Sequence, residues 1–385
     1  MKSIKDFNFK GKKVILRLDL NVPIKDGKIL SEEKINSSLN TINYIRDNGG
    51  KIIILSHLGK VKTEEDKKKN SLFIVYQNLL NKYSNMYFSS STHGKILEDK
   101  INLLKEGDIL LVENTRFEDL DGKKESTCNE ELSKYWASLG DIFINDAFGM
   151  THRRHASNYG ISKYLPSGIG FLIEKEIKGL KPVIYPQKPF VIIMGGAKVT
   201  DKLDVIKGIL PKCDHLLVGG GIANTFIACN YNVGKSLIDV DKIEELKELL
   251  NEYGNKIIYP KDVIVLENGN IKEININNLT NESIVYDIGS QTIKEYSKYI
   301  QEASTIFING TMGLYENSNY EKGTKEILNE VMNSKAIKVA GGGDALASIE
   351  KFQIKEFDYK STGGGATLEY IKTGKLHCFD DDTIG

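Results

Sequence analysis

Basic side chains in the first half of the chain gather just after short apolar runs. RLDLNVP begins at Arg17, LSHLGK at Leu55, ENTRF at Glu113 and NDAFGMTHRRHAS at Asn145. Apolar runs of this kind are typical of strands buried on both faces of a parallel sheet, whose carboxyl ends meet at one edge. The basic residues there are Arg17, His57, Lys60, Arg116, His152, Arg153 and His155. Their convergence from four predicted strands indicates a pocket for a small anion that carries phosphate and carboxylate.

A metal site at His152 and His155 is the alternative interpretation of part of this group. The two histidines have i,i+3 spacing, but two arginines lie between them and no Cys or acidic partner is near in the sequence. Zinc sites draw their ligands from Cys, His and carboxylates, so the anion pocket is the better interpretation.

Glycines of the second half cluster in four loops. VIIMGGAKVTDK begins at Val191, HLLVGGGIANTF at His215, KVAGGGDA at Lys338 and KSTGGGATL at Lys360. Three of these loops follow an apolar run directly, and each precedes a predicted helix. A glycine turn into a helix offers backbone N–H groups and the positive end of the helix dipole to a phosphate. Tight strand–helix packing is the alternative for any one loop, but four loops together predict a nucleotide-phosphate site.

Two lysines and one aspartate adjoin these loops. Lys198 and Lys202 follow the first glycine pair with i,i+4 spacing, which predicts one helical face that an anion would neutralise. Asp344 follows the third glycine cluster and is a candidate ligand for Mg²⁺, which takes one or two protein carboxylates. The P-loop and dinucleotide fingerprints are absent, since position 229, where a P-loop ending at Gly234–Ser236 would need Gly, is Cys.

These motifs require a sheet to position them, and the rest of the sequence predicts one. Short apolar runs alternate with helical segments, which predicts doubly wound α/β architecture with parallel sheets. The predicted helices include Ser37–Arg46, Phe171–Leu180 and Asp241–Glu252. A proline-punctuated connector at 181–190 and a solvated charged loop at 62–70 are also expected. The predicted strands are Val14–Leu18, Ile52–Leu55, Ile109–Val112, Ile142–Ile144, Phe190–Met194, His215–Val218, Lys256–Ile258, Thr305–Ile308 and Ala336–Val339.

Length, net charge, cysteine spacing and the length of the apolar runs narrow the possible functions and the location of the protein. A length of 385 residues predicts two domains, and 52 basic against 52 acidic residues give a net charge of zero, which argues against a nucleic-acid binder. The four cysteines form no CxxC pair, and no apolar run approaches the ~20 residues of a membrane span. We therefore expect a cytoplasmic protein with reduced thiols and no membrane partner.

The ordered motifs resemble the phosphoglycerate kinase family from about Val14 to His377. Besides those above, GFLIEKE and INGTMGLYE stand in family order. The resemblance implies two doubly wound parallel-sheet lobes joined by a hinge helix, and a monomer in which hinge bending brings the lobes together. Residues 1–171, completed by a tail at about 375–385, would bind 3-phosphoglycerate, and residues 172–374 would bind ATP or ADP with Mg²⁺. The reaction implied is reversible phosphoryl transfer between 1,3-bisphosphoglycerate and ADP.

The resemblance also implies a role for each matching residue. The catalytic set is Lys34, Lys202, Gly343 and Gly365. The substrate set is Arg17, Asp19, Asn21, His57, Lys60, Arg116, Arg153 and His155. The nucleotide set is Gly195, Gly196, Lys198, Gly219, Gly220, Asn309, Glu316, Gly341, Gly342, Asp344 and Ala345, with Asp344 also facing the metal.

Several positions depart from the family pattern. Lysines stand where the family has arginine at Lys34 and Lys60, and a lysine keeps the charge but loses the planar fork. The others are Thr311 for Pro, Ala345 for Thr, Gln291 for Lys and Tyr359 for His. These departures leave open a divergent paralogue with weak or altered activity, or a non-enzymatic nucleotide-binding protein.

Overall fold

The computed structural model describes residues 1–379 and divides them into two compact units. Unit 1 contains Met1–Ile177 and residues 375–379, and unit 2 contains Lys178–Gly374. The boundary falls inside helix α6 (Phe171–Ile184). Residues 380–385 of the predicted tail lie outside the described residues. Among the described residues, no helix combines the length and the apolar character needed to cross a membrane.

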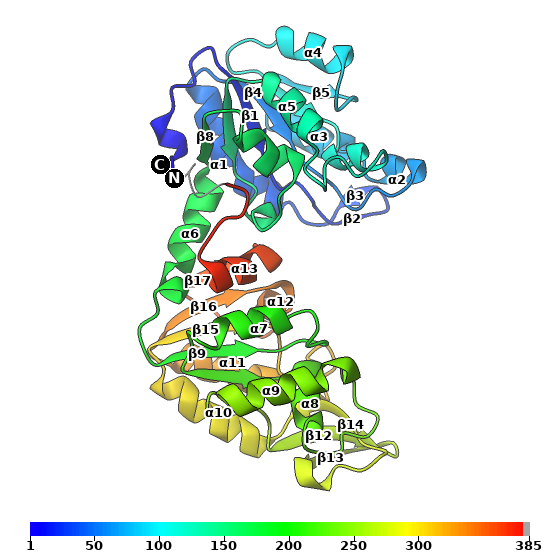
Figure 1. Ribbon diagram of the computed structural model, residues 1–385, viewed down its shortest axis with the longest axis vertical. Coiled ribbons are helices and arrows are strands. Elements are labelled where there is room, and N and C mark those ends of the chain that lie inside the picture. Colours follow the sequence, from blue (N-terminus) through cyan, green and yellow to red (C-terminus); the bar gives the residue numbers. More distant parts are fainter. Residues whose placement is uncertain (380–385) are drawn as a thin grey trace. The chain divides into compact units, whose positions relative to one another are not determined.

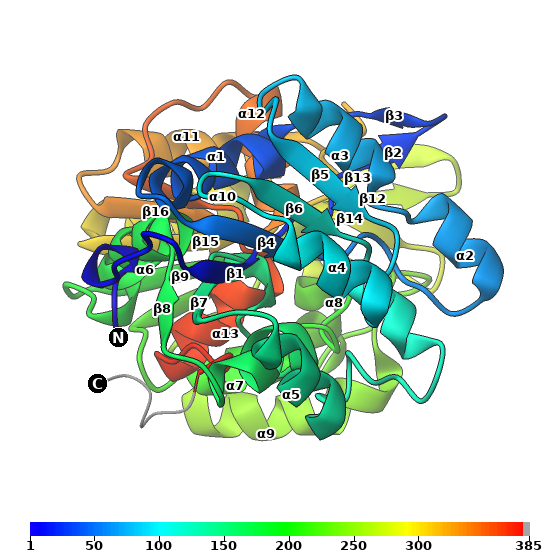
Figure 2. The same ribbon diagram turned by 90° about the horizontal axis from the view of Figure 1, so that it is seen from above.

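Unit 1 is built on a parallel sheet in the order β5-β6-β4-β1-β7-β8. Figure 2 shows β5, β6, β4 and β1 side by side in that order. The strands are β1 (Lys13–Arg17), β4 (Lys51–Leu55), β5 (Met86–Ser89), β6 (Ile109–Val112), β7 (Ile142–Asn145) and β8 (Ser167–Ile169), and a hairpin joins β2 (Ile24–Lys25) to β3 (Lys28–Ile29). The helices are α1 (Glu33–Asp47), α2 (Glu64–Lys69), α3 (Phe73–Leu80), α4 (Lys95–Asn102) and α5 (Glu130–Ser138).

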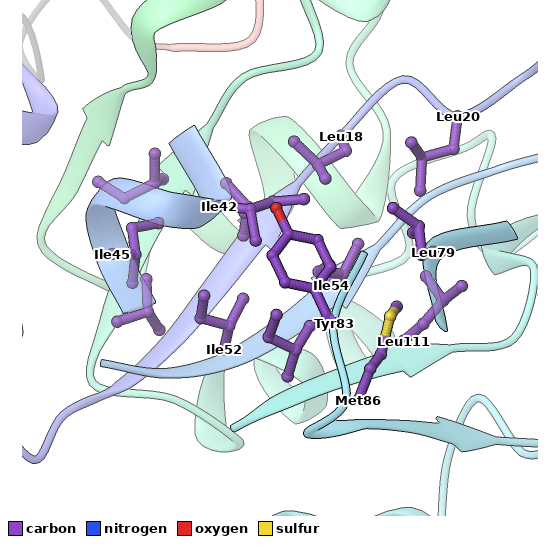
Figure 3. Packing of buried hydrophobic residues seen from close by; sticks show 14 of the residues in the cluster. Leu18, Leu20, Ile42, Ile45, Ile52, Ile54, Leu79, Tyr83, Met86 and Leu111 are labelled. Atoms are coloured by element: carbon purple, nitrogen blue, oxygen red, sulfur yellow. The ribbon is translucent and has the colours of Figure 1, made fainter. Parts of the chain in front are cut away.

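Both faces of this sheet are covered, which explains the continuous apolar runs. Ile52 and Ile54 of β4 face a core that α1 and α3 complete, and Figure 3 shows Ile42 and Ile45 of α1 over these strand residues. Ile53, between them, faces the opposite core, which α4 and α5 complete. Alternate residues of one strand thus serve two cores, and the carboxyl ends of the strands are left free to carry polar residues.

Unit 2 repeats this plan in the order β11-β10-β9-β15-β16-β17, all parallel. Figure 1 shows β9, β15, β16 and β17 side by side in that order. The strands are β9 (Phe190–Met194), β10 (His215–Val218), β11 (Ile257–Ile258), β15 (Thr305–Asn309), β16 (Ile337–Gly341) and β17 (Tyr359–Ser361). The helices are α7 (Leu203–Ile209), α8 (Gly220–Ala228), α9 (Ile243–Tyr253), α10 (Ser290–Glu302), α11 (Lys322–Asn333), α12 (Gly343–Lys351) and α13 (Gly365–Thr373). Helices α10 and α11 pack on one face through a core that includes Val191 and Ile193 of β9.

A second, antiparallel sheet of unit 2 was not predicted from the sequence. It consists of β12 (Asp262–Glu267), β13 (Asn270–Asn275) and β14 (Ile284–Ile288) in the order β13-β12-β14. Strand β13 reads NIKEIN, and none of its six residues is buried. The apolar-run signal of a buried parallel strand is therefore absent from it.

Two local predictions were wrong. The charged segment 62–70 contains α2, because Thr63 and Asp66 form a capping box that satisfies the first N–H groups of a short helix. The expected proline connector at 181–190 begins as helix, because α6 continues through Pro182 to Ile184. Tyr185 N still donates to Lys181 O at 3.0 Å, so helical hydrogen bonding continues past Pro182, which itself has no N–H to donate.

Candidate functional site

Arg17 is the buried centre of the basic pocket in unit 1. It is the last residue of β1 and has no exposed surface. Its Nε donates to Ser157 Oγ at 2.9 Å, one terminal nitrogen bonds the carbonyl of Leu18, and the other lies 3.2 Å from His57 Nδ1. The guanidinium is therefore held from several sides by residues that the ends of the strands bring together.

The acidic and amide residues of the predicted substrate set lie in the loop after β1. Asp19 accepts a 2.8 Å ion pair from Lys34 Nζ, which rises from the first turn of α1. Asn21 Oδ1 accepts from Gly59 N at 2.8 Å and so fixes the loop after β4 beside the loop after β1. Lys60 follows in that second loop and is exposed.

The remaining predicted cations differ in their exposure. Arg116 lies in a 3₁₀ turn after β6 and is partly buried, Arg153 is exposed, and His155 is 6% exposed. Arg116 Nε is buried and has no hydrogen-bond partner among the described residues, whereas His155 Nδ1 faces Glu125 Oε1 at 3.7 Å. Since buried polar atoms normally find partners, the unpaired Arg116 Nε favours a ligand that supplies an acceptor.

Burial controls the protonation of this pocket. Burial, followed by the positive charges of Arg17 and Arg116, holds the pKa of His57 well below its ordinary value. Burial also lowers the pKa of Arg116, and the neighbouring charge of Arg153 acts in the same direction. His57 is thus neutral near pH 7, and the cationic character of the pocket comes from the guanidinium groups.

Glu125 and Ser157 belong to this group but were missed in the sequence. Ser157 closes the NDAFGMTHRRHAS motif, so its position could have been noticed. Glu125 lies in GKKES, an ordinary charged segment, yet the structure buries it completely with Ser157 and His155. A buried carboxylate in a loop leaves no pattern that sequence periodicity would detect.

The predicted glycine loops of unit 2 lead directly into helices in three of four cases. Helix α8 begins at Gly220, α12 at Gly343 and α13 at Gly365. Gly342 and Gly364, which precede α12 and α13, adopt conformations that suit glycine, with φ of 96° and 57°, and Gly220 at the start of α8 has φ of 62°. In α8 two of the first N–H groups are already used, because Gly220 N donates to Met312 O at 2.8 Å and Ile222 N to Gly196 O at 3.2 Å. The first turns of α12 and α13 are the better place for a phosphate.

The expected helix at Lys198 and Lys202 does not form. The chain runs as a loop from Gly195 to Lys202, which is the cap residue of α7, so the two lysines share no helical face. Thr200 is held instead by Asp239, whose carboxylate accepts from its N–H at 2.9 Å and its hydroxyl at 3.1 Å. Lys198 is exposed, whereas Lys202 turns inward and its Nζ donates to Gly195 O at 2.5 Å.

Burial lowers the pKa of Lys202 to about 8, while Asp344 and Asp201 favour its charged form. Lys202 is therefore a partly buried ammonium group beside Asp344, at the foot of the glycine loops. No cluster of three His, Cys, Asp or Glu residues suited to a metal occurs within 1–379. Asp344 alone still fits Mg²⁺, because that ion completes its shell with phosphate oxygens and water.

A cavity of about 550 Å³ lies beside these loops. Such a volume suits a nucleotide-sized ligand. Of the predicted nucleotide residues, it brings together Gly196, Gly220, Glu316 and Asp344. Further lining residues, which the sequence did not suggest, include Leu237, Pro260, Val263, Tyr286 and Leu314.

Other predicted nucleotide residues support the loops without lining the cavity. Asn309 Nδ2 donates to Gly341 O at 2.7 Å and joins the loops after β15 and β16. Gly195 packs against the backbone of Thr311, where an added Cβ would lie 1.8 Å from the carbonyl oxygen. The side chain of Asn309 and the absence of one at Gly195 therefore shape the loops that a phosphate would approach.

Four other positions that depart from the family pattern differ in their burial and contacts. Thr311 lines the cavity and donates to Gly313 O at 3.1 Å, and Ala345 is fully buried in the first turn of α12. Gln291 is exposed in the first turn of α10. The ring of Tyr359 occupies the space beside Gly179, where a Cβ would lie 2.3 Å from it.

Comparison with known proteins agrees with this geometry. A family model described as phosphoglycerate kinase matches residues 4–375. The chain belongs to the phosphoglycerate kinase family. A phosphoglycerate kinase of Staphylococcus epidermidis is 47% identical over 384 residues, which are 97% of each chain. One of Listeria monocytogenes is 47% identical over 386 residues, again 97% of each.

Solved phosphoglycerate kinase structures also match. The structure from Coxiella burnetii has a TM-score of 0.86 at 34% identity and covers 98% of this chain and 97% of its own. The structure from Pyrococcus horikoshii OT3 has a TM-score of 0.82 at 32% identity with the same coverage. Membership of the phosphoglycerate kinase family makes the chain a phosphotransferase and confirms the predicted fold of two parallel-sheet lobes.

Proposed function

We propose that this chain reversibly transfers a phosphoryl group between 1,3-bisphosphoglycerate and ADP, giving 3-phosphoglycerate and ATP. The observation that carries the proposal is the 47% identity to phosphoglycerate kinases over 97% of both chains. The retained chemistry supports it, because one unit carries a buried cationic pocket and the other a glycine-lined cavity.

Unit 1 would bind the glycerate. Arg17, Arg116 and Arg153 would neutralise its phosphate, and Lys60 would add a flexible charge. Asp19 would accept a hydrogen bond from its hydroxyl group, and Asn21 and the neutral ring of His57 would donate to its carboxylate. His155 would complete the pocket beside Arg17.

Unit 2 would bind the nucleotide. Gly195, Gly196, Gly219 and Gly220 would border the adenosine, Glu316 would bind the ribose, and Lys198, Lys202, Asn309 and the loop at 341–345 would approach the phosphates. Mg²⁺ would bind Asp344 and supply charge neutralisation of the phosphate oxygens.

The proposed chemistry needs no general base, because the attacking group in the ATP-consuming direction is already a carboxylate. The chain then has to position the two substrates and neutralise charge on the transferring group. Lys202, Lys34 and the N–H groups of Gly343 and Gly365 would serve that purpose. Closure by hinge bending would exclude water from the reacting groups.

We further propose that the protein acts as a cytoplasmic monomer on small molecules alone. Its net charge of zero argues against nucleic acid as a partner. Size-exclusion chromatography with light scattering tests the monomer.

A coupled assay tests the proposed reaction. The purified chain would be given Mg-ATP and 3-phosphoglycerate, and acyl phosphate formation would be followed through a dehydrogenase that consumes it. Turnover that requires both substrates supports the proposal. Calorimetric binding of ADP without turnover would instead indicate a nucleotide-binding protein that has lost this reaction.

A further inference from the structure

A fully buried carboxylate lies beneath the basic pocket of unit 1. Glu125, in the turn between the 3₁₀ segment Thr115–Asp119 and α5, has no exposed surface. Its Oε2 accepts from Ser157 N at 2.9 Å, and its Oε1 accepts from Ser157 Oγ. His155 Nδ1 lies 3.7 Å from the same Oε1. Burying an ionised group is costly unless it is paired, so these contacts need an explanation.

The donors and acceptors define a directed chain of hydrogen bonds. Arg17 Nε can only donate, so Ser157 Oγ accepts from it at 2.9 Å. The hydroxyl hydrogen of Ser157 then points to Glu125. This chain joins the segments of Arg17, Ser157 and Glu125, which are distant in sequence. The orientation of the Arg17 guanidinium therefore depends on Glu125, to which it is linked through two successive hydrogen bonds.

Charge explains why the acceptor is a carboxylate. Burial acts to raise the pKa of Glu125, but the ring of His155 facing it at 3.7 Å, followed by the charge of Arg17, brings it below its ordinary value. Burial lowers the pKa of both Arg17 and Arg116, because each carries its positive charge in a poorly solvated place. The charge of Glu125 acts in the opposite direction on both pKa values. The carboxylate is the internal counter-ion of a pocket whose cations would otherwise repel one another.

We propose that Glu125, acting through Ser157, is a positioning residue for the substrate-anion site. It fixes the guanidinium of Arg17 and the ring of His155 in the orientation that receives the glycerate, without touching the glycerate itself. This inference rests on the proposed function, since the anion is taken to be 3-phosphoglycerate.

Substitution by glutamine would break the chain while keeping the volume. The amide oxygen could still accept from Ser157 N, but the amide nitrogen would then face Ser157 Oγ as a second donor. Ser157 Oγ would receive hydrogens from both Arg17 and the amide, and its own hydrogen would have no acceptor. The internal counter-charge would also be lost.

Glu113 provides a matched control in the same unit. It is 5% exposed, and its carboxylate accepts from Leu72 N at 2.7 Å, Asn114 N at 2.8 Å and Ser71 Oγ at 2.6 Å. Its side chain has no hydrogen bond to the basic pocket. Glu113→Gln therefore reports the cost of removing a buried carboxylate charge at a place that organises the start of α3.

Steady-state kinetics of Glu125→Gln and Glu113→Gln, with melting temperatures, would test the proposal. We expect Glu125→Gln to raise KM for 3-phosphoglycerate about tenfold or more, with KM for Mg-ATP within about twofold of wild type. Glu125→Asp, which restores the charge on a shorter side chain, should recover part of that loss. A KM for 3-phosphoglycerate within twofold of wild type would overturn the proposal. Equal losses for both substrates that Glu113→Gln reproduces would overturn it as well.

Two further measurements keep the outcome decisive. If Glu125→Gln does not fold, Ser157→Ala removes the relay and keeps the carboxylate, and the same selective rise in KM is expected. If the wild type shows no turnover, the proposed reaction has failed, and calorimetric binding of 3-phosphoglycerate decides between the two ideas. Wild-type binding that Glu125→Gln weakens supports the positioning role, and absent wild-type binding overturns it.

Discussion

Unit 1 and unit 2 use different parts of the chain to prepare a place for an anion. In unit 1 the charge is carried by side chains, with Arg17 fully buried and a buried Glu125 as counter-ion. In unit 2 the cavity is bordered by glycine loops, and helices α8, α12 and α13 begin at Gly220, Gly343 and Gly365. Both sites lie at the carboxyl ends of parallel strands, so one sheet plan supports two kinds of anion recognition.

The difference determines what each site can tolerate. A side-chain site depends on the type of each residue and on the hydrogen bonds that orient it. A backbone site depends on close approach and on conformations that only glycine adopts easily. We therefore expect unit 1 to be sensitive to loss of charge and unit 2 to addition of a methyl group.

Lys202 is the exception in unit 2, and its removal should have the largest effect. It is a mostly buried ammonium group next to Asp344, and no backbone N–H can replace its full charge. Lys202→Ala should lower kcat on the order of 10²–10³-fold while the melting temperature stays near that of wild type. Steady-state kinetics with both substrates saturating would measure it.

Lys207→Ala is the control for this prediction, because Lys207 lies on α7 in an ion pair with Glu245 at the surface. It should keep wild-type turnover. Retention of more than about a tenth of the rate in Lys202→Ala would contradict the role given to Lys202 and make unit 2 a purely backbone site.

Gly195→Ala should show the sensitivity of unit 2 to a methyl group. The new Cβ would lie 1.8 Å from Thr311 O, a backbone atom that cannot move alone. We expect the free energy of unfolding to fall by about 3 kcal/mol and the affinity for ADP to fall with it. Urea denaturation and calorimetry would measure the two effects.

Gly343→Ala is the matched stability control, since nothing lies within 4 Å of its added Cβ. Its free energy of unfolding should change by less than about 1 kcal/mol, because alanine is also the better helix former. A stable Gly195→Ala variant would show that the loop after β9 can move away from Thr311.

The sequence predicted the two sites unequally, and the reason is physical. Nine buried strands were recognisable because both faces of each sheet are covered. The cations of unit 1 were recognisable by type, and the glycines of unit 2 by clustering. Glu125 was missed because its burial depends on contacts with distant residues, and the helix expected at Lys198 and Lys202 was wrong because a loop held by Asp239 replaces it.

Each unit also contains one buried aspartate whose protonation should make the stability of the protein depend on pH. Burial raises the pKa of Asp146 in unit 1 to about 7, although Thr41 Oγ1 and Ile173 N donate hydrogen bonds to its carboxylate. Burial likewise raises the pKa of Asp287 in unit 2 to about 7, although Gly323 N donates to it. Each folded pKa lies above the unfolded value of about 3.9, so the folded protein holds a proton that the unfolded chain loses. Stability should therefore fall as pH rises from about 4 to about 7, by up to about 4 kcal/mol for each residue.

Urea denaturation between pH 4.5 and 7.5 would measure this slope in wild type, Asp146→Asn and Asp287→Asn, with each variant expected to lose its own part. A slope unchanged in both variants would assign the pH dependence to other groups. A slope lost in only one variant would show that the two units differ in this respect too.

Lys34→Arg should have the smallest effect, and it sharpens the view of unit 1 as a site that depends on residue type. Lys34 Nζ forms a 2.8 Å ion pair with Asp19, so the charge is already held in place. A guanidinium could keep that ion pair and present a second nitrogen to the transferring group, which an ammonium cannot do as a planar fork. We expect kcat to rise about threefold to tenfold, with KM for Mg-ATP unchanged, since a donor that acts only in the transition state raises kcat alone. An equal or lower kcat would mean that the pocket around Asp19 has adjusted to lysine, and that the position of the charge matters more there than the shape of the group that carries it.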